Sequence, residues 1–463
     1  MNIHENSRIY FIGIGGIAMS AAAGIARQLG HEVSGSDSKA LYSPAKDVLE
    51  ELDIPYHVGY AEEQVKMAGT DFFIASSGED TTNPEIAYLV TNNIPLYSLS
   101  QLLYALCEDK LRIVVTGTHG KSTTTAMLGK TLQYIDDSSF MTGAVLIDEH
   151  RNFHCGDGHY AVFEGDEYKA LYDDPTPKFQ QYKPDIALLT NIEFDHPDMY
   201  GSLAEIVGEF EEMIANMPDD ALLVYNSDNA ELVKMMHHNN LGQVSFGIDH
   251  PADFSASNII TEAEQTLFTV THKNTVEQYA INVFGTINVY NSLGVIALLR
   301  TLGFSAEQVQ EGLREYKGIK RRFELVAEKD GIKVFDDYAH HPTAIKETLA
   351  LAKLRFPDKR IWAIFEPHTY SRTKATLPEL SQAFENADKV LLAEIYPARE
   401  QKSASTITGS EVVEAISHNH SDVRLVADKT ATKAILDAEL QSGDVVVVMA
   451  VGDFNKLAKE IVA

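Results

Sequence analysis

Short apolar runs recur along the chain and alternate with stretches that have a helical pattern. Several of these runs lack polar alternation, which is typical of strands that are buried on both faces of a sheet. Apolar strands that alternate with helices predict an α/β fold with parallel sheets. The candidate strands are residues 8–14, 71–77, 112–117, 160–165, 186–192, 221–226, 332–338, 360–366, 389–396 and 444–450.

The length indicates several domains, because 463 residues are too many for one hydrophobic core. The pattern of strand and helix begins anew three times, which predicts domains at residues 1–107, 108–318 and 319–463. In the second of these, residues 254–284 alternate polar and apolar side chains and predict a small antiparallel sheet.

Composition argues against several classes of protein. The formal net charge of -29 disfavours a nucleic-acid partner, since a phosphate-binding surface needs an excess of Lys and Arg. The apolar start of the chain is too short and too rich in glycine for a membrane span or a signal peptide, so we expect a cytoplasmic protein with no membrane partner. Cys107 and Cys155 form no C-x-x-C motif, which argues against a disulfide framework or a cysteine zinc site.

A glycine-rich turn follows the first candidate strand. Gly13, Gly15 and Ala18 fit G-x-G-x-x-[GA], and Asp37 follows about 20 residues later. Such glycines let the backbone approach a pyrophosphate at the start of a helix. The motif therefore predicts a site for a nucleotide diphosphate, and it fits NAD and other diphosphates equally.

A second loop, "GTHGKST", joins the strand at 112–117 to a helical pattern. The general phosphate-binding loop is G-x-x-x-x-G-K-[ST], and Val115 stands where its first glycine is expected. The order of strand, G-K-S and helix still predicts an abbreviated loop that binds ATP. Lys121 would contact the β- and γ-phosphates, and the hydroxyl of Ser122 or Thr123 would hold Mg²⁺. The candidate ATP-binding residues here are Gly117, Thr118, His119, Gly120, Lys121, Ser122 and Thr123.

Acidic residues follow two further candidate strands, in "EGDEY" and "NIEFDHP". Ligands of open α/β sheets bind at the carboxyl ends of the strands. Glu164 and Glu167 are therefore candidate oxygen ligands for Mg²⁺, and His196 is a candidate ligand for a second ion.

Clusters of Asp, His, Tyr and Arg mark the last third of the chain. They occur in "GIKRRFELV", "FDDYAHHPTAI" and "FEPHTYSRT" (318–326, 335–345 and 365–373). This mixture suits an anionic, polar ligand, and Arg321 or Arg322 could neutralise developing phosphate charge.

In this order the motifs resemble those of the Mur ligases, the ATP-dependent amide-forming enzymes of peptidoglycan synthesis. "GTHGKS" is the loop form of that family, so the glycine missing at Val115 is expected there. The resemblance covers residues 9 to 452 and is carried by "GIGGIAMS", "GTHGKSTTT", "EGDEY", "TNIEFDHPDMY", "KRRFE", "DDYAHHPT" and "EPHTYSRT".

The resemblance implies an N-terminal Rossmann-like domain for a UDP-sugar, a central phosphate-loop ATPase domain and a C-terminal Rossmann-like domain. The implied substrates are UDP-N-acetylmuramate, ATP with Mg²⁺ and an amine. The C-terminal motifs favour L-alanine as the amine. The alternative is the tripeptide L-alanyl-γ-D-glutamyl-meso-diaminopimelate, as in a recycling ligase, which "ARQLGHEVSGSD" and "EGDEY" resemble. A monomer or a weak homodimer is expected.

The resemblance also implies a role for individual residues. The UDP-sugar would lie along Gly13, Gly15, Gly16, Ile17, Asp37, Ser76 and Asn83. Ser122 and Glu164 would hold magnesium, His196 a second metal ion, and Asn288 and Asn291 the adenine. Arg322 and Asp337 would face ATP, and the amine would lie near Tyr338, His340, His368 and Arg372. The implied catalytic set is Lys121, His196, Arg322, His340 and Arg372.

Two positions depart from the family pattern. Ile287 stands where the family has the His of its adenine-binding pair, which leaves more of that contact to Asn288. Thr369 stands where many members carry Arg, so one charge commonly found near the amine is absent.

The implied chemistry is attack of a carboxylate on the γ-phosphate of ATP, followed by attack of the amine on the acyl phosphate. Two other classes of protein fit part of the pattern. An NAD-dependent oxidoreductase would explain the first glycine loop but not "GTHGKS", and a nucleotide-binding protein without catalysis would bind ATP and form no product.

Overall fold

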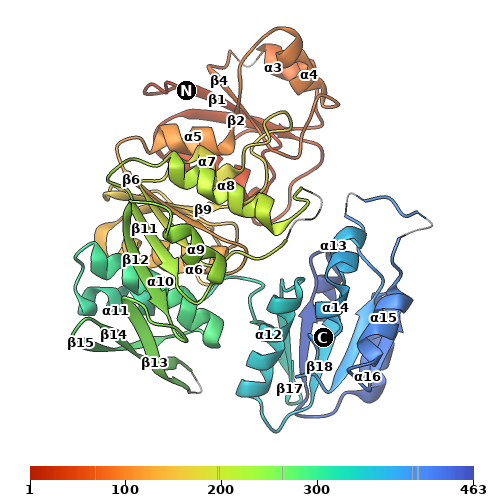
Figure 1. Ribbon diagram of the computed structural model, residues 1–463. Helices are drawn as coiled ribbons and strands as arrows, with labels where there is room; N and C mark the ends of the chain where they lie inside the picture. Colours follow the sequence, from red (N-terminus) through yellow and green to blue (C-terminus); the bar gives the residue numbers. More distant parts are fainter. Residues whose placement is uncertain are drawn as a thin grey trace. The chain divides into compact units, whose positions relative to one another are not determined.

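The computed structural model describes residues 1–462 except 68, 196, 198, 263, 399, 404 and 405. The chain forms two compact units. The first comprises Met1–Glu193, Ala204–Ile260 and Gln265–Gly318, and the second comprises Phe194–Leu203, Thr261–Glu264 and Ile319–Ala463. Figure 1 shows the elements of both units in chain order. Among the described residues, no helix combines the length and the apolar character that a membrane crossing needs.

Among the described residues, the N-terminal sheet has five parallel strands in the order β3-β2-β1-β4-β5. They are β1 (Arg8–Ile12), β2 (Glu32–Asp37), β3 (Tyr56–Val58), β4 (Phe72–Ala75) and β5 (Leu96–Ser98). The strand order reverses between β1 and β4, and ligands of open α/β sheets bind at the carboxyl ends of the strands at such a point. The helices of this part are α1 (Ile17–Gln28), α2 (Ala45–Glu51), α3 (Glu62–Met67), α4 (Pro84–Thr91) and α5 (Leu99–Leu106).

The central sheet of the described chain has ten strands in the order β15-β14-β13-β12-β11-β10-β6-β9-β7-β8. The strands near its middle are β6 (Leu111–Thr116), β9 (Tyr160–Gly165), β10 (Ile186–Leu189), β11 (Leu222–Asn226) and β12 (Gly242–Gly247), which are parallel. The short strands β7 (Ser139–Met141) and β8 (Phe153–His154) form one edge.

The other edge contains β13 (Phe254–Thr261), β14 (Thr266–His272) and β15 (Thr275–Ile281). β14 and β15 are antiparallel, as the alternating pattern predicted. They extend the central sheet, however, and do not form a separate small sheet, because β12 pairs with β13.

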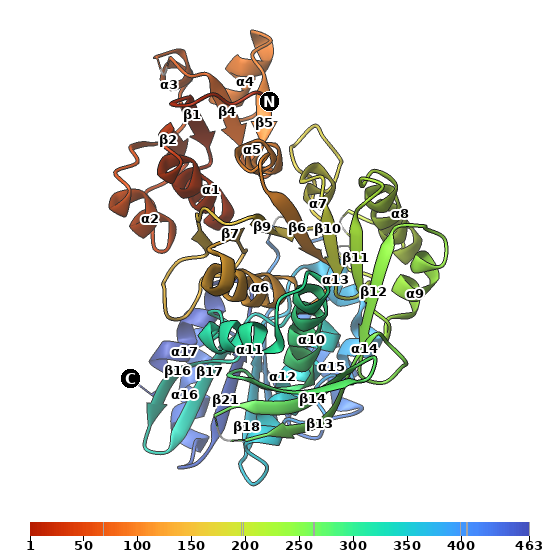
Figure 2. The same cartoon turned by 90° about the vertical axis from the view of Figure 1, so that its left-hand side faces the viewer.

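Two long helices pack on the central sheet and contact each other (Figure 2). α6 (Lys121–Asp136) lies against β6, β7 and β9, and α10 (Thr286–Thr301) lies against β11 and β12. Both helices are buried along most of their length, with Thr123 to Leu132 buried in α6. The remaining helices here are α7 (Lys178–Gln181), α8 (Leu203–Ala215), α9 (Ala230–Met236) and α11 (Ala306–Glu315).

The C-terminal sheet has six strands among the described residues, in the order β16-β17-β21-β18-β19-β20. The strands are β16 (Glu324–Lys329), β17 (Ile332–Asp337), β18 (Ile361–Phe365), β19 (Lys389–Ala393), β20 (Val423–Val426) and β21 (Val445–Met449). All neighbouring pairs are parallel except β16 with β17.

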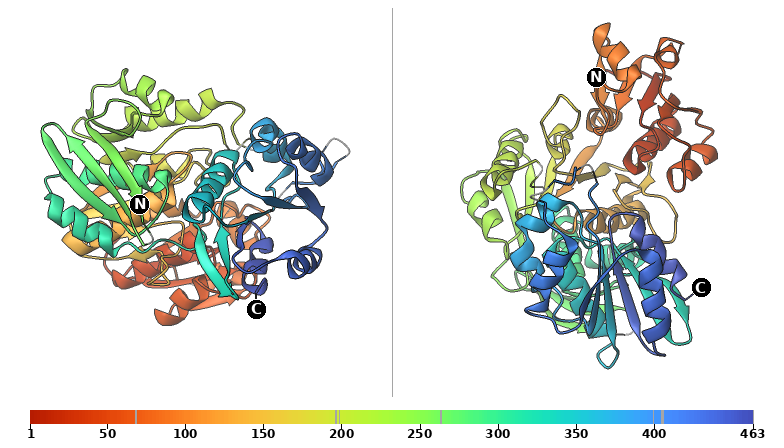
Figure 3. Two further views of the ribbon diagram at one scale, coloured as in Figure 1. Left: turned by 90° about the horizontal axis from the view of Figure 1, so that it is seen from below. Right: turned by 90° about the vertical axis from the view of Figure 1, so that its right-hand side faces the viewer.

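Helices cover both faces of the C-terminal sheet (Figure 3, cyan to blue). Successive strand residues point to opposite faces, so Val445, Val447 and Met449 join one core while Val446 and Val448 join the other. The first core includes α12 (Pro342–Arg355), α14 (Leu377–Leu380) and α15 (Gly409–Ser417), and the second includes α16 (Lys429–Glu439), η1 (Asp453–Lys456) and α17 (Leu457–Glu460).

All ten runs that the sequence marks as strand candidates contain a strand, and the sheets are mostly parallel. The predicted α/β class is therefore confirmed. The domain boundaries at 107/108 and 318/319 stay predictions.

Candidate active site

The glycine turn after β1 lies at the switch point of the N-terminal sheet. Gly13 has φ +81°, and a Cβ on it would lie 2.9 Å from Ser76 Cβ. A Cβ on Gly15 would lie 2.6 Å from Asp37 Oδ2, which accepts the Gly15 N–H at 2.8 Å. The carboxyl ends of β1, β2 and β4 thus bring together Gly13, Gly15, Asp37 and Ser76, which the sequence predicts to bind the UDP-sugar.

The start of α1 and the start of α4 face the same turn. α1 begins at Ile17 after Gly16, and backbone N–H groups at a helix start attract anions. Asn83 caps α4 and donates to Glu79 Oε2 at 2.9 Å. Glu79 Cγ lies 3.5 Å from the position of a Cβ on Gly13, so Asn83 reaches the turn through Glu79, a residue that no sequence motif singled out.

The phosphate loop spans residues 117–120, between β6 and α6. Gly117 and Gly120 have φ of +129° and +84°, which favour glycine. Asn191, after β10, accepts the Thr118 N–H at its backbone oxygen and the His119 N–H at its side-chain oxygen, both at 2.9 Å. The neighbouring strand end therefore fixes the shape of the loop.

Lys121 is held inside the loop by three oxygens. Its Nζ donates to Gly117 O at 2.6 Å and to Thr118 O at 3.1 Å, and it pairs with Glu167 Oε2 at 2.7 Å. Burial lowers the pKa of Lys121, but the nearby carboxylates, Glu167 foremost, outweigh this and raise it above its ordinary value. Burial raises the pKa of Glu167 to about 7, against the effect of Lys121. The lysine is thus charged, and a phosphate bound in the loop would compete with Glu167 for its ammonium group.

Ser122 and Glu164 form an oxygen pair at the start of α6. Ser122 Oγ donates to Glu164 Oε1 at 2.7 Å. Thr123, the alternative hydroxyl, is buried in α6, so Ser122 is the side chain that meets the carboxylate. A hydroxyl and a carboxylate oxygen beside a phosphate loop are ligand types that Mg²⁺ prefers. The residues present therefore fit a magnesium ion.

The predicted adenine contacts lie against the same loop. A Cβ on Gly120 would lie 2.5 Å from Asn291 Oδ1. Asn291 Nδ2 donates to Asn288 Oδ1 at 3.1 Å, and Asn288 Nδ2 donates to Phe284 O at 2.7 Å. The first unit thus brings Asn288, Asn291 and the phosphate loop together.

In the second unit, Arg322 lies in a tight turn before β16. Its neighbours Arg321 and Phe323 have φ of +62° and +49°, which is uncommon for residues with a side chain. Carboxylates hold the turn, since Glu324 accepts the Arg321 N–H at 2.9 Å and Asp337 accepts the Phe323 N–H at 2.7 Å. Burial raises the pKa of Asp337, and the charge of Arg322 opposes this. Both guanidinium groups lie over the ring of Tyr338, at 4.9 and 5.6 Å from its centroid.

The predicted amine-site residues form one cluster of rings and charges. The His340 ring lies edge-on to Tyr338 and to His368, with centroids 5.3 and 5.8 Å apart. His368 in turn stacks on Tyr396 at 5.9 Å. Arg372, only 4% exposed, donates from Nε to Asp195 Oδ1 and contacts His368 Nδ1, both at 2.8 Å.

Hydrogen bonds assign opposite roles to the two histidines. A guanidinium only donates, so His368 Nδ1 accepts from Arg372 and its proton lies on Nε2. His340 Nδ1 donates to Tyr338 O at 2.8 Å, which leaves Nε2 as the nitrogen that can take up a proton. Burial, reinforced by the charge of Arg372, holds the pKa of His340 well below its ordinary value. His340 is therefore a neutral imidazole near pH 7.

Some predicted residues lie elsewhere or outside the described chain. His196 is outside the described residues, so its role as a metal ligand stays a prediction. Thr369 caps α13 (Tyr370–Ala375) with φ +62°, and its N–H donates to Tyr396 O at 2.8 Å. The sequence does not predict a role for Asp195, although it is part of the same D-H-P motif as His196.

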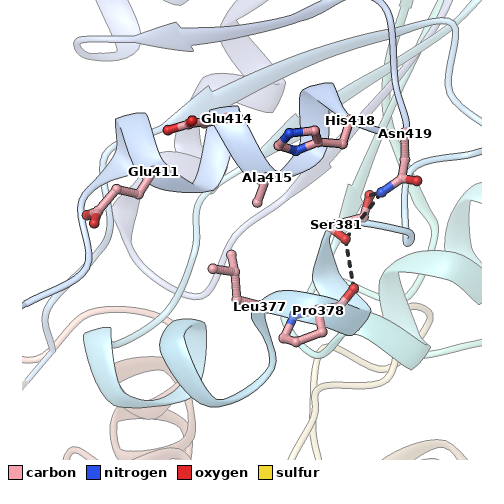
Figure 4. Close-up of a pocket in the computed structure, with 8 residues that line it drawn as sticks. All are labelled: Leu377, Pro378, Ser381, Glu411, Glu414, Ala415, His418 and Asn419. Carbon is pink, nitrogen blue, oxygen red and sulfur yellow. Dashed lines mark hydrogen bonds between the residues drawn. The ribbon is translucent and has the colours of Figure 1, made fainter.

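A shallow pocket of about 350 Å³ between α14 and α15 contains none of the predicted site residues. Figure 4 shows its lining side chains. They are Leu377, Pro378, Ser381, Glu411, Glu414, Ala415, His418 and Asn419.

Comparison with known proteins places these clusters in a family. Three family models match in succession: "Mur ligase family, catalytic domain" over 8–111, "Mur ligase middle domain" over 115–299, and "Mur ligase, glutamate ligase domain" over 321–452. The UDP-N-acetylmuramate–L-alanine ligase of Desulfitobacterium hafniense is 35% identical, over 98% of this chain and 99% of its own. The chain belongs to the Mur ligase family. The UDP-N-acetylmuramate–L-alanine ligase of Desulforapulum autotrophicum is 34% identical, over 99% of this chain and 98% of its own.

Solved structures agree with this membership. The UDP-N-acetylmuramate-alanine ligase of Thermotoga maritima superimposes on this Mur ligase with a TM-score of 0.80, at 26% identity over 98% of each chain. A murein peptide ligase of Psychrobacter arcticus superimposes with a TM-score of 0.73, at 27% identity over 98% of each chain.

Proposed function

We propose that this Mur ligase joins L-alanine to the lactyl carboxylate of UDP-N-acetylmuramate and converts ATP to ADP and phosphate. The observation that carries the choice of substrates is the full-length match to L-alanine ligases at 35% identity. The abbreviated phosphate loop, with Lys121 beside the Ser122–Glu164 pair, supports ATP as the energy source.

The reaction proceeds in two steps. A carboxylate oxygen of the UDP-sugar attacks the γ-phosphorus of ATP, and the bond to ADP breaks to give an acyl phosphate. The α-amine of L-alanine then attacks the acyl carbon, and phosphate leaves from a tetrahedral intermediate. Two anions meet in the first step, so positive charge must be fixed between them.

The residues of the first unit serve the first step. Lys121 exchanges its contact with Glu167 for the β- and γ-phosphates, and Ser122 and Glu164 would hold Mg²⁺. A bound magnesium ion would neutralise phosphate charge. Asn288 and Asn291 contact the adenine, and Gly13, Gly15, Gly16, Ile17, Asp37, Ser76 and Asn83 line the UDP-sugar site. His196 would hold a second ion.

The residues of the second unit serve the amine. His340 Nε2 accepts a hydrogen bond from the attacking amine, because its Nδ1 is committed to Tyr338 O. His368 donates from Nε2 and Arg372 supplies positive charge, which suits the carboxylate of an amino acid. Tyr338 completes this cluster, and Arg322 and Asp337 face ATP.

Oxygen transfer tests the proposed route. UDP-N-acetylmuramate labelled with ¹⁸O in its lactyl carboxylate is incubated with ATP, Mg²⁺ and L-alanine, and the released phosphate is analysed by mass spectrometry. Because the acyl phosphate links that carboxylate to phosphorus, we expect one labelled oxygen in each phosphate. Unlabelled phosphate formed together with product would contradict the route.

A further inference from the structure

The segment that follows β7 donates hydrogen bonds to one carboxylate oxygen of Glu164, Oε2. The Gly143 N–H donates to Oε2 at 2.5 Å, and Thr142 Oγ1 lies 3.1 Å from the same oxygen. The other oxygen, Oε1, faces Ser122 Oγ at 2.7 Å. The two oxygens of this carboxylate therefore have different surroundings.

Thr142 also connects the two sides of the oxygen pair. Its Oγ1 lies 3.1 Å from Ser122 O as well as from Glu164 Oε2, so its single proton is shared between the backbone of one residue and the side chain of the other. Thr142 is fully buried, and its backbone is fixed on both sides by the buried Asn152. The Thr142 N–H donates to Asn152 O at 2.9 Å, and Asn152 Nδ2 donates to Thr142 O at 2.8 Å.

Gly143 lies close to both oxygens of the Glu164 carboxylate. A Cβ on Gly143 would lie 3.0 Å from both oxygens of Glu164. The Gly143 backbone therefore lies against the carboxylate, and a Cβ at this position would require the carboxylate to shift by a few tenths of an ångström.

We propose that Thr142 and Gly143 are positioning residues that hold Glu164 as a metal ligand through Oε1 alone. This inference rests on the proposed function, because it requires that Ser122 and Glu164 hold the magnesium ion. Carboxylates that bind metals are commonly fixed by a second set of hydrogen bonds, and loss of such a partner weakens metal binding about 10- to 100-fold. With Oε2 satisfied by Thr142 and Gly143, Oε1 is the oxygen left to share the ion with Ser122.

Binding of Mn²⁺ in the presence of ADP tests the proposal without turnover. Free Mn²⁺ is measured by electron paramagnetic resonance during titration of the full-length protein. Thr142→Val keeps the shape of the side chain and removes the hydroxyl, so we expect about 10-fold weaker binding. Thr142→Ser keeps the hydroxyl and should stay within about twofold of the wild type. Gly143→Ala displaces the carboxylate and should weaken binding independently.

Thr432→Val is the matched control, since Thr432 is an equally buried threonine on α16 of the second unit. It should leave Mn²⁺ binding unchanged. Wild-type affinity in both Thr142→Val and Gly143→Ala, with melting temperatures like that of the wild type, would overturn the proposal. A wild-type protein that binds no Mn²⁺ with ADP would instead overturn the proposed metal site, and the positioning role with it.

Discussion

At the scale of single residues, Gly120 shows how closely the phosphate loop and α10 approach each other. Its φ of +84° is costly for other residues, and a Cβ there would lie 2.5 Å from Asn291 Oδ1. We expect Gly120→Ala to lose about 1–2 kcal/mol of stability and to raise the KM for ATP about 10-fold. Steady-state kinetics with ATP as the varied substrate measure this.

Gly303 is the matched control for backbone strain. It has φ +96°, and among the described residues no atom beyond its chain neighbours lies within 4 Å of a Cβ there. Gly303→Ala should therefore cost stability and leave the KM for ATP unchanged. Equal effects of the two variants on that KM would contradict a contact between Gly120 and Asn291 in the nucleotide site.

The neutral His340 predicts a pH-dependent stability. Its pKa lies well below the ordinary value because of burial and the charge of Arg372, so the unfolded chain binds the proton more tightly than the folded chain. As the pH falls below about 6.5, protonation of His340 in the unfolded chain lowers the free energy of unfolding. A variant without the imidazole does not have this loss. We expect the free energy of unfolding of the wild type to fall more steeply between about pH 6.5 and pH 5 than that of His340→Gln.

Trp362 is the probe for this measurement. It is the single tryptophan of the chain and is fully buried in β18 of the same unit. Urea unfolding followed by its fluorescence gives the free energy at each pH. If the free energy of unfolding depended on pH in the same way in the wild type and in His340→Gln, His340 would not be held neutral by its surroundings.

At the scale of elements, two helical glycines make opposite predictions. A Cβ on Gly24 of α1 would lie 2.5 Å from the ring of Phe153 in β8, whereas among the described residues nothing lies within 4 Å of one on the exposed Gly208 of α8. Alanine gains about 1 kcal/mol of helix propensity, but overpacking costs about 1–3 kcal/mol. Gly24→Ala should thus lower the melting temperature and Gly208→Ala should raise it. A rise for both would mean that α1 is not tightly packed on β8.

The segment Phe194–Leu203 belongs to the second unit, where a buried ion pair joins it to α13. The side chains of Asp195 and Arg372 are 7% and 5% exposed. Removal of one partner of a buried pair costs about 3–5 kcal/mol, and part of that cost disappears when the other partner is removed too. We expect Asp195→Ala and Arg372→Met to be non-additive in unfolding followed by Trp362 fluorescence. Additive costs would mean that the pair contributes no coupling.

At the scale of the whole molecule, the features that could be predicted from the sequence are those determined by patterns of neighbouring residues. Strands of a parallel sheet that are buried on both faces read as unbroken apolar runs, so each of the ten candidate runs contains a strand. Parallel strands that include serine and glycine, such as β2 and β12, were not among the candidates. The phosphate loop and the acidic strand ends were found because their chemistry lies within a few consecutive residues. The edge strands β14 and β15 were predicted as antiparallel. That they belong to the central sheet depends on the pairing of β13 with β12, which no local sequence pattern indicates.

The residues that were missed act through partners far away in sequence. Asp195 is 177 residues from its partner Arg372, and Thr142 is 22 residues from its partner Glu164. Glu79 carries no motif and reaches the glycine turn only because the chain folds β4 beside β1. Threonine and glutamate are also common in ordinary loops, so these residues can be told from solvent-facing ones only by their contacts in the folded structure.

The mass of the product tests the central claim most directly. The protein is incubated with ATP, Mg²⁺ and UDP-N-acetylmuramate, with L-alanine in one tube and L-alanyl-γ-D-glutamyl-meso-diaminopimelate in another. We expect a product heavier by one alanine residue in the first tube, formed together with ADP. A mass gain only with the tripeptide would contradict L-alanine as the substrate, and ADP formation in neither tube would contradict the ligase itself.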